Sequence, residues 1–208
     1  MTPLVARLRE TRTGSAARRS LVFDEREVWW EVRGRTPAPL SVHDMAATAL
    51  VHRAMFEGRD LHIEGPVTRS LLDGLAEYVA LWALWRPGYY QSISVTAAEE
   101  APSAPANEAA VAAFSGGVDA SFTLLRHARK LAGRGSRPIH SAVLIQGFDI
   151  PLSADDAFAR AEQSARETLA SLDIPLSVVA TNWREVCADW EMEHGAALAT
   201  CLRNWQGE

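Results

Sequence analysis

The stretch Phe114-Ser115-Gly116-Gly117-Val118-Asp119-Ala120-Ser121 decides the fold. It follows a short apolar run at 110–114 and leads straight into a helical pattern. Two consecutive glycines allow backbone conformations closed to other residues and let a ligand approach closely. The amides that follow belong to a helix N-terminus, where unpaired N–H groups and the helix dipole favour an anion. The stretch therefore predicts a strand, an anion-binding loop and a helix.

After this loop the chain alternates between apolar runs and amphipathic segments. The runs at 139–145 and 176–180 predict two more strands. The predicted helices bury two stripes of residues, which are Leu124, Leu125, Ala128, Leu131 and Ala132, then Phe158, Ala161, Ala165, Leu169 and Leu172. Ser153 with Asp156 and Asn182 with Glu185 predict helix starts, and Gly195 is expected to interrupt the last helix. The pattern favours a parallel sheet covered on both faces, with ligands at the carboxyl ends of its strands.

The first half of the chain has a different pattern. Residues 21–23 and 27–32 predict a hairpin, and short strands are expected at 61–63 and 91–96. Ser41 with Asp44 predicts the cap of a helix that ends near Gly58, and a second helix carries Leu72, Leu75, Val79, Trp82 and Trp85 on one face. Tryptophans and tyrosines between 78 and 90 fit core packing better than a pocket. We expect a small α+β domain at 1–97, a linker at 98–110 and an α/β domain at 111–208.

Composition excludes several classes of protein. The 208 residues carry a formal net charge of −5, so a broad basic surface for nucleic acid is not expected. No stretch approaches the roughly 20 apolar residues of a membrane-spanning helix, and the N-terminus lacks the apolar core of a secretory signal. Two cysteines without paired spacing exclude a disulfide scaffold and a four-cysteine zinc site. We therefore expect a cytoplasmic protein that binds neither membranes nor nucleic acid.

The loop resembles the SGGxDS signature of the PP-loop ATP pyrophosphatases, which include GMP synthetase, asparagine synthetase, queuosine-pathway synthases and tRNA-thiolating enzymes. The resemblance covers strand, loop and helix, and implies a HUP-like doubly wound parallel sheet. It also implies that ATP is cleaved between its α- and β-phosphates, that an acceptor is adenylated, and that a nitrogen or sulfur nucleophile then displaces AMP. The loop is neither a Walker loop nor a GxGxxG dinucleotide loop.

The resemblance also implies which residues bind ATP and Mg²⁺. Ser115, Gly116, Gly117, Asp119 and Ser121 would cradle the pyrophosphate, with Asp119 as the magnesium ligand. Ala113 and Phe114 would lie beside the ribose and adenine. Gly147 and Phe148 follow the second strand, where relatives contact adenine. Ala120 also lies in the binding loop, at a position where most members have serine.

Other residues are weaker candidates. A plain connection explains the loop 146–149 as well as adenine contacts do, and Thr181-Asn182 fits a helix cap. Arg184 and His194 could reach a ligand, but a solvated arginine and a satisfied histidine explain them better. Cys187 could carry sulfur, although a small buried apolar role is the stronger interpretation. A solvated face explains the basic run Arg126, His127, Arg129, Lys130, Arg134 and Arg137. No catalytic residue is identified.

The predicted sheet is incomplete. The resemblance implies five strands in the order 3-2-1-4-5, and only three follow the linker. The open edge of the first strand requires the N-terminal unit, another chain or further strands to cover it. We favour a homo-oligomer, a partner chain or a shortened sequence over coverage by the N-terminal unit.

Two functions remain open. The first is an AMP-forming, ligase-like ATP pyrophosphatase that adenylates a small-molecule acceptor and then transfers nitrogen or sulfur. The second is a non-catalytic, nucleotide-binding accessory subunit with a degenerate loop. A third interpretation, tRNA modification, requires a basic face that the sequence does not offer.

Overall fold

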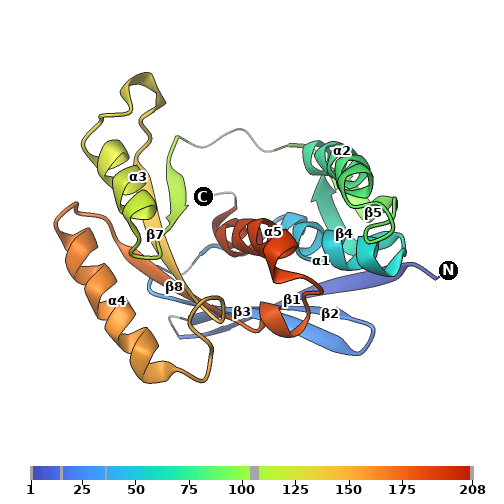
Figure 1. Cartoon of the computed structure of the whole chain (residues 1–208), viewed down its shortest axis with the longest axis horizontal. Coiled ribbons are helices and arrows are strands. Elements are labelled where there is room, and N and C mark those ends of the chain that lie inside the picture. Colours follow the sequence, from blue (N-terminus) through green and yellow to red (C-terminus); the bar gives the residue numbers. More distant parts are fainter. Residues whose placement is uncertain (1, 15, 36, 104–107, 207–208) are drawn as a thin grey trace.

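The computed structural model describes residues 2–14, 16–35, 37–103 and 108–206 (Figure 1). The strands are β1 Leu4–Thr13, β2 Ala16–Phe23, β3 Arg26–Arg33, β4 Leu61–Thr68, β5 Val95–Ala101, β6 Ala110–Ala113, β7 Ile139–Gln146 and β8 Leu176–Thr181. The α-helices are α1 Asp44–Glu57, α2 Arg69–Trp85, α3 Val118–Ala128, α4 Asp155–Ala170 and α5 Trp190–Leu202. Three short 3₁₀ turns are η1 Gly133–Gly135, η2 Trp183–Glu185 and η3 Arg203–Trp205.

All these strands belong to one mostly parallel sheet, in the order β5-β4-β1-β2-β3-β8-β7-β6. β6, β7 and β8 are parallel neighbours, as are β1, β4 and β5, while β1, β2 and β3 form an antiparallel meander. The two groups join where β3 pairs antiparallel with β8, from Trp30 opposite Thr181 to Arg33 opposite Val178. The chain is therefore a mixed α/β protein whose sheet runs through both expected domains.

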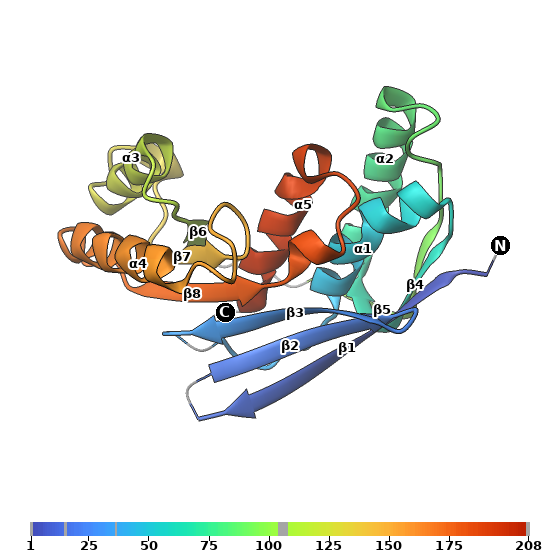
Figure 2. The same cartoon turned by 60° about the horizontal axis from the view of Figure 1, so that its bottom comes forward.

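The helices cover the two faces of the sheet at β7 and β8. Side chains of a strand alternate between faces, and Val143 and Val179 accordingly pack in a core that also contains residues of α1 and α5. Ala142, Leu144 and Val178 pack instead with residues of α3 and α4. Figure 2 shows α1 and α5 on the same side of the sheet, above the meander. A doubly covered parallel sheet was predicted for this part of the chain, and the structure confirms it.

Several local predictions are also confirmed. The β2–β3 hairpin turns at Asp24 and Glu25, whose φ values of 42° and 63° suit a tight two-residue turn. Helix α1 ends at Gly58 in the left-handed conformation, and its amide donates to carbonyls of the last turn. Tyr78, Trp82 and Tyr90 surround the buried His52, with ring centroids 5.0–5.4 Å from the imidazole. Tyr90 is buried in the core, and Tyr78 and Trp82 pack against it, whereas Trp85, predicted on the same face of α2, is 62% exposed.

The predicted helix caps are wrong. α1 begins at Asp44 after His43, so Ser41 does not cap it. The Asp44 carboxylate instead accepts hydrogen bonds from the amide and hydroxyl of Thr68, both at 2.7 Å, and this long-range pairing replaces the local cap. α4 begins at Asp155 without a side-chain cap from Ser153.

The last helix also differs from the prediction. The 182–185 stretch forms only the turn η2, and α5 starts after Asp189, whose carboxylate accepts from the amides of Glu191 and Met192. Gly195 lies inside α5 without interrupting it, because the rest of the helix packs against α1.

The N-terminal strands extend beyond the prediction. Residues before 20 form β1 and part of β2. In β1 the buried or half-buried Leu4, Ala6 and Leu8 alternate with the exposed Val5, Arg7 and Arg9. The predicted start of the linker at residue 98 is wrong, because β5 continues to Ala101 by pairing with β4. Residues 104–107 of that linker lie outside the described residues.

Candidate functional site

The Ser-Gly-Gly loop lies where predicted, between β6 and α3. Phe114 is buried, and its amide donates to the Val143 carbonyl of β7 at 2.8 Å, which fixes the end of the strand. Gly116 has a φ of 81°, a conformation that glycine adopts without strain. The Gly117 amide donates to the Ser115 hydroxyl at 3.3 Å, and α3 begins at the next residue. The loop is therefore a turn with exposed amides at a helix N-terminus.

A cavity of about 530 Å³ opens beside this loop. Its size is typical of small-molecule sites, which measure roughly 300–1,000 Å³. Its lining residues are Ala113, Phe114, Ser115, Asp119, Ala120, Val143, Leu144, Ile145, Phe148, Asp149, Ile150, Trp190, His194 and Leu198. The cavity lies at the carboxyl ends of β6 and β7, the edge at which ligands bind in sheets of this kind.

The structure brings together many of the residues predicted to bind a nucleotide. The predicted residues in the lining are Ala113, Phe114, Ser115, Asp119, Ala120 and Phe148. The remaining predicted residues are not among the described residues that line the cavity: Gly116 and Gly117 lie in the loop before α3, Ser121 in the first turn of α3, and Gly147 in the loop after β7. For the glycines this agrees with a backbone role, since they have no side chain to present.

The loop after β7 is held against the end of β8. Gly147 has a φ of 100°, and a Cβ atom there would lie 1.9 Å from the Thr181 carbonyl oxygen. Its amide donates to the Ile150 carbonyl at 2.8 Å and closes a turn. This close approach requires glycine, and it carries Phe148 and Asp149 to the cavity.

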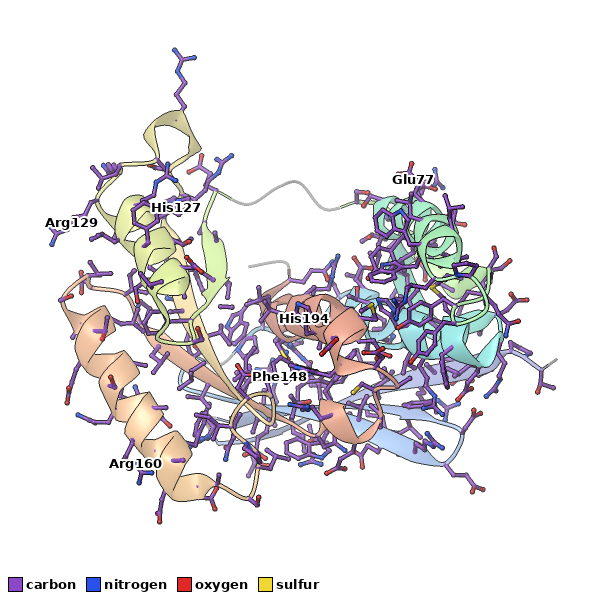
Figure 3. The ribbon with its side chains drawn as sticks, in the orientation of Figure 1. Glu77, His127, Arg129, Phe148, Arg160 and His194 are labelled. Carbon is purple, nitrogen blue, oxygen red and sulfur yellow. The ribbon has the colours of Figure 1, made fainter. Side chains whose placement is uncertain are left out.

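Helix α5 supplies a wall of the cavity, and of this wall the sequence offered only His194, as a weak candidate. Trp190, His194 and Leu198 recur every four residues and so share one face of the helix. The Trp190 ring lies 4.8 Å from the Phe148 ring, between centroids. Figure 3 shows His194 on α5 close to Phe148, with His127 and Arg129 at the far end of α3. The four-residue spacing was the only sequence signal for this wall.

Arg184 ties the wall together. Its guanidinium carbon lies 4.6 Å from the centre of the Trp190 ring, and its Nη1 donates to the Phe148 carbonyl at 3.2 Å. Arg184 is exposed, as the sequence predicted for a solvated arginine, and it also contacts the protein through these two groups. Asn182 is structural, because its amide bridges the Trp29 amide, the Glu27 carbonyl and the Glu185 carboxylate.

The cavity has carboxylates from two segments but no complete metal site. Asp119 in the first turn of α3 and Asp149 after β7 line it. Across the part of the chain that the structure describes, no three His, Cys, Asp or Glu residues come together to hold a metal. Mg²⁺ in nucleotide sites commonly takes one or two protein carboxylates, with phosphates and water completing its shell. Asp119 fits that role beside the exposed loop amides.

The cysteines lie outside the cavity lining. Cys201 is fully buried, and burial raises the pKa of its thiol. Burial also raises the pKa of the Cys187 thiol, which donates weakly to the Arg184 carbonyl at 3.6 Å. A reactive thiolate needs the opposite shift, so neither cysteine has the environment of a sulfur carrier.

The basic run surrounds a separate cavity. His127, Lys130 and Arg137 line a space of about 360 Å³ at the other end of β7. Cations there adjoin the C-terminal ends of α3 and α4, whose dipoles they complement. This agrees with the interpretation of these residues as a solvated basic face. Among the described residues no helix is long and apolar enough to cross a membrane.

No protein-family model matches the chain, and no curated protein or solved structure resembles it significantly. The candidate site therefore stands on its own residues and geometry.

Proposed function

We propose that the chain binds Mg²⁺–ATP in the 530 Å³ cavity and is an AMP-forming, ligase-like enzyme with a PP-loop in a HUP-like fold. The observation that carries the proposal is the Ser115-Gly116-Gly117 turn, which opens on this cavity at the N-terminus of α3. Exposed amides and a positive dipole end provide an anion site without any charged side chain. The order β8-β7-β6 equals the 3-2-1 half of the strand order that the resemblance implies.

Each part of the site has a role in this proposal. The amides of Gly116 and Val118 and the Ser115 hydroxyl bind phosphate oxygens, with Ser121 as a further donor in the first turn of α3. Asp119 holds Mg²⁺, whose charge stabilises the departing pyrophosphate. Phe148 and Trp190 offer aromatic surfaces for the base. The remaining cavity accepts a small carboxylate or amide-like acceptor.

The proposed reaction breaks the bond between the α-phosphorus and the bridging oxygen to the β-phosphate. The acceptor forms a bond to the α-phosphorus, and pyrophosphate leaves with the electron pair. A nitrogen or sulfur nucleophile then attacks the adenylated acceptor and forms a bond to it, and AMP leaves from the acceptor. The loop contributes to catalysis through positioning and electrostatic stabilisation of the transition state. The free cysteines fit the reducing environment of the cytoplasm.

Calorimetry with Mg²⁺–ATP tests the nucleotide site. Gly117→Val should abolish binding, because its Cβ would lie 3.3 Å from the Ser115 hydroxyl and its methyl groups would obstruct the loop amides. Gly135→Val is the matched control, because a Cβ added at Gly135 would meet no atom within 4 Å and this residue lies outside the cavity lining. Equal affinity in the wild type and Gly117→Val would overturn the proposal.

The second candidate function is a nucleotide-binding accessory subunit. Ala120 favours it, because this residue lines the cavity and offers no hydroxyl where the resemblance implies serine. Binding of Mg²⁺–ATP without release of AMP or pyrophosphate, across a panel of carboxylate acceptors, would support the accessory role. Release of both products would support the enzyme.

The edge of β6 supports a protein partner as part of the proposal. The N-terminal meander pairs with β8, and no strand in the described residues pairs with the outer side of β6. β5, at the other edge, carries Glu99 and Glu100, charges that discourage pairing, whereas β6 is Ala-Val-Ala-Ala. We propose a homo-oligomer or a partner chain at this edge, and sedimentation of a monodisperse monomer would contradict it.

A further inference from the structure

Among the described residues, His194 is the one histidine in the lining of the 530 Å³ cavity. It lies on the α5 wall, on the same helix face as Trp190, whose ring centroid is 6.2 Å from that of the imidazole. The Ser-Gly-Gly loop and Asp119 contribute to the lining from β6 and α3. A proton-transfer group on α5 would therefore share its ligand with the candidate phosphate site.

The hydrogen bond of His194 fixes which of its nitrogens carries the proton. Nδ1 lies 2.9 Å from the Glu191 carbonyl oxygen. A carbonyl only accepts hydrogen bonds, so Nδ1 is the donor and the neutral ring keeps its lone pair on Nε2. The side chain is exposed rather than packed in the core. Such an arrangement suits a general base, because the protein orients one nitrogen and the other keeps a lone pair that can accept a proton.

Three other histidines have different environments. His52 is buried, and desolvation lowers its pKa to about 4, with Nε2 hydrogen-bonded to the Tyr78 hydroxyl at 2.6 Å. His62 Nδ1 is paired with the Thr96 hydroxyl. His127 Nδ1 accepts from the Arg137 amide and lines the other cavity. His194 therefore combines a fixed tautomer with a place in the candidate site.

We propose that His194 is a catalytic base, whose Nε2 takes the proton from an O–H or N–H nucleophile in this cavity. The inference rests on the proposed function and deepens it. Water is the simplest such nucleophile: its oxygen bonds to the α-phosphorus of ATP, and the bond to the bridging oxygen breaks. The electron pair leaves with pyrophosphate, and the water proton passes to Nε2. An amine attacking an adenylated acceptor transfers its proton to Nε2 in the same way, and AMP leaves.

Charged and polar groups from several elements line the cavity together with the imidazole. Asp119 from α3 and Asp149 from the β7 loop are the carboxylates in this lining among the described residues. From its own helix the ring faces the Glu191 carbonyl, the negative end of a peptide dipole. Arg184 of η2 has its guanidinium over Trp190 and its hydrogen bond on Phe148.

Magnetic resonance of histidine Cε1–H groups tests the position of His194, with the Mg²⁺ complex of α,β-methylene-ATP as a probe that cannot be cleaved. The His194 signal, assigned with His194→Gln, should move on addition of the probe, while the His127 signal should stay unchanged. Calorimetry on the same sample separates the two proposals. If the probe binds and the His194 signal does not move, the proposed role of His194 as a base is wrong. If the probe does not bind, both the proposed nucleotide site and the proposed role of His194 are wrong.

Release of AMP and pyrophosphate from Mg²⁺–ATP tests the chemical role. His194→Gln keeps a polar group near the Nε2 position but cannot take a proton. We expect it to bind the probe within about twofold of the wild type and to release AMP at least about tenfold more slowly. It should also lose the fall in rate toward acid pH that protonation of a catalytic base would cause in the wild type. His127→Gln is the control and should match the wild type. If His194→Gln has the rate and pH profile of the wild type, His194 is not a general base in this reaction.

Discussion

The guanidinium group of Arg184 lies over the ring of Trp190, 4.6 Å from its centre. The same side chain donates to the carbonyl oxygen of Phe148 at 3.2 Å. One residue of η2 thereby joins the loop after β7 to the first turn of α5. The aromatic wall of the cavity is held by this bridge, because Phe148 and Trp190 come from segments about 40 residues apart.

Arg184→Ala should loosen this wall. A cation–π contact is worth about 0.5–1 kcal/mol and a charged hydrogen bond about 1.5–3 kcal/mol. Because part of this is recovered from water, we expect a loss of about 1–2 kcal/mol in the free energy of unfolding and weaker Mg²⁺–ATP binding. Urea denaturation and calorimetry measure the two effects. Arg160→Ala, on the exposed surface of α4, is the control. Equal losses in both variants would refute the bridge.

Asp119→Asn should weaken nucleotide binding only when magnesium is present. The amide keeps the size of the side chain but is a poor ligand for Mg²⁺. We expect the affinity for Mg²⁺–ATP to fall by about tenfold or more, and the affinity for ATP in excess chelator to stay the same or rise. Calorimetry under both conditions measures this. Asp149→Asn is the matched variant in the same cavity, and a loss of the same size there would contradict a specific role for Asp119.

Gly147→Ala and Gly116→Ala should differ strongly in stability. Both glycines have a positive φ, which costs other residues about 1–2 kcal/mol. Only at Gly147 would the new Cβ collide with a backbone oxygen, whereas at Gly116 it would meet open space. We expect a loss of at least about 3 kcal/mol for Gly147→Ala and about 1 kcal/mol for Gly116→Ala. Denaturant titration of both variants measures these losses. A similar loss of unfolding free energy in Gly147→Ala and Gly116→Ala would contradict the close approach of Gly147 to Thr181.

His52 should make the fold less stable in mild acid. Desolvation lowers the pKa of the folded-state imidazole from 6.5 to about 4, so between these values the unfolded chain binds more protons. Stability therefore falls as the pH decreases through this window, by about 2 kcal/mol between pH 6.5 and pH 5. Burial raises the pKa of Glu193, which acts in the opposite sense.

The variant His52→Gln isolates that contribution. Gln can still bond the Tyr78 hydroxyl but does not titrate, so the slope of stability against pH should flatten between pH 7 and pH 5. Glu10 and Asp24, whose pKa values are lowered by partner arginines, titrate below this range. His62→Gln is the control, because His62 is partly exposed. If the slope of stability against pH persists in His52→Gln, it arises from groups other than His52.

The sequence predicted the parts of the molecule that depend on local patterns. Gly116 and Gly117 after an apolar run indicated the loop, and the 110–180 alternation indicated the parallel strands. It failed where a distant partner decides the outcome. Asp44 has the spacing of a capping residue, yet Thr68 binds its carboxylate. The pairing of β3 with β8 has no local signal, since either strand would pair equally well with other apolar strands.

In the candidate site, too, the residues set by local sequence were predicted and those set by distant packing were not. Ser115 and Asp119 were predicted from their places in the SGGxDS-like stretch after β6, and Phe148 was predicted because it lies just after β7. Trp190 and Leu198 were missed, and His194 was ranked low, because their place in the lining depends on how α5 crosses the sheet. That crossing is set by packing of α5 against α1, near the other end of the chain.

The pairing of β3 with β8 can form only late in synthesis of the chain. Arg33 pairs with Val178, so the ribosome must add about 145 residues after β3 before its partner exists, which takes roughly 7–30 s at 5–20 residues per second. During that interval the meander has an open edge that carries Trp30 and Val32. The nascent chain therefore passes through a long aggregation-prone stage, and chaperones that shield strand edges should matter more for its yield than its modest size suggests.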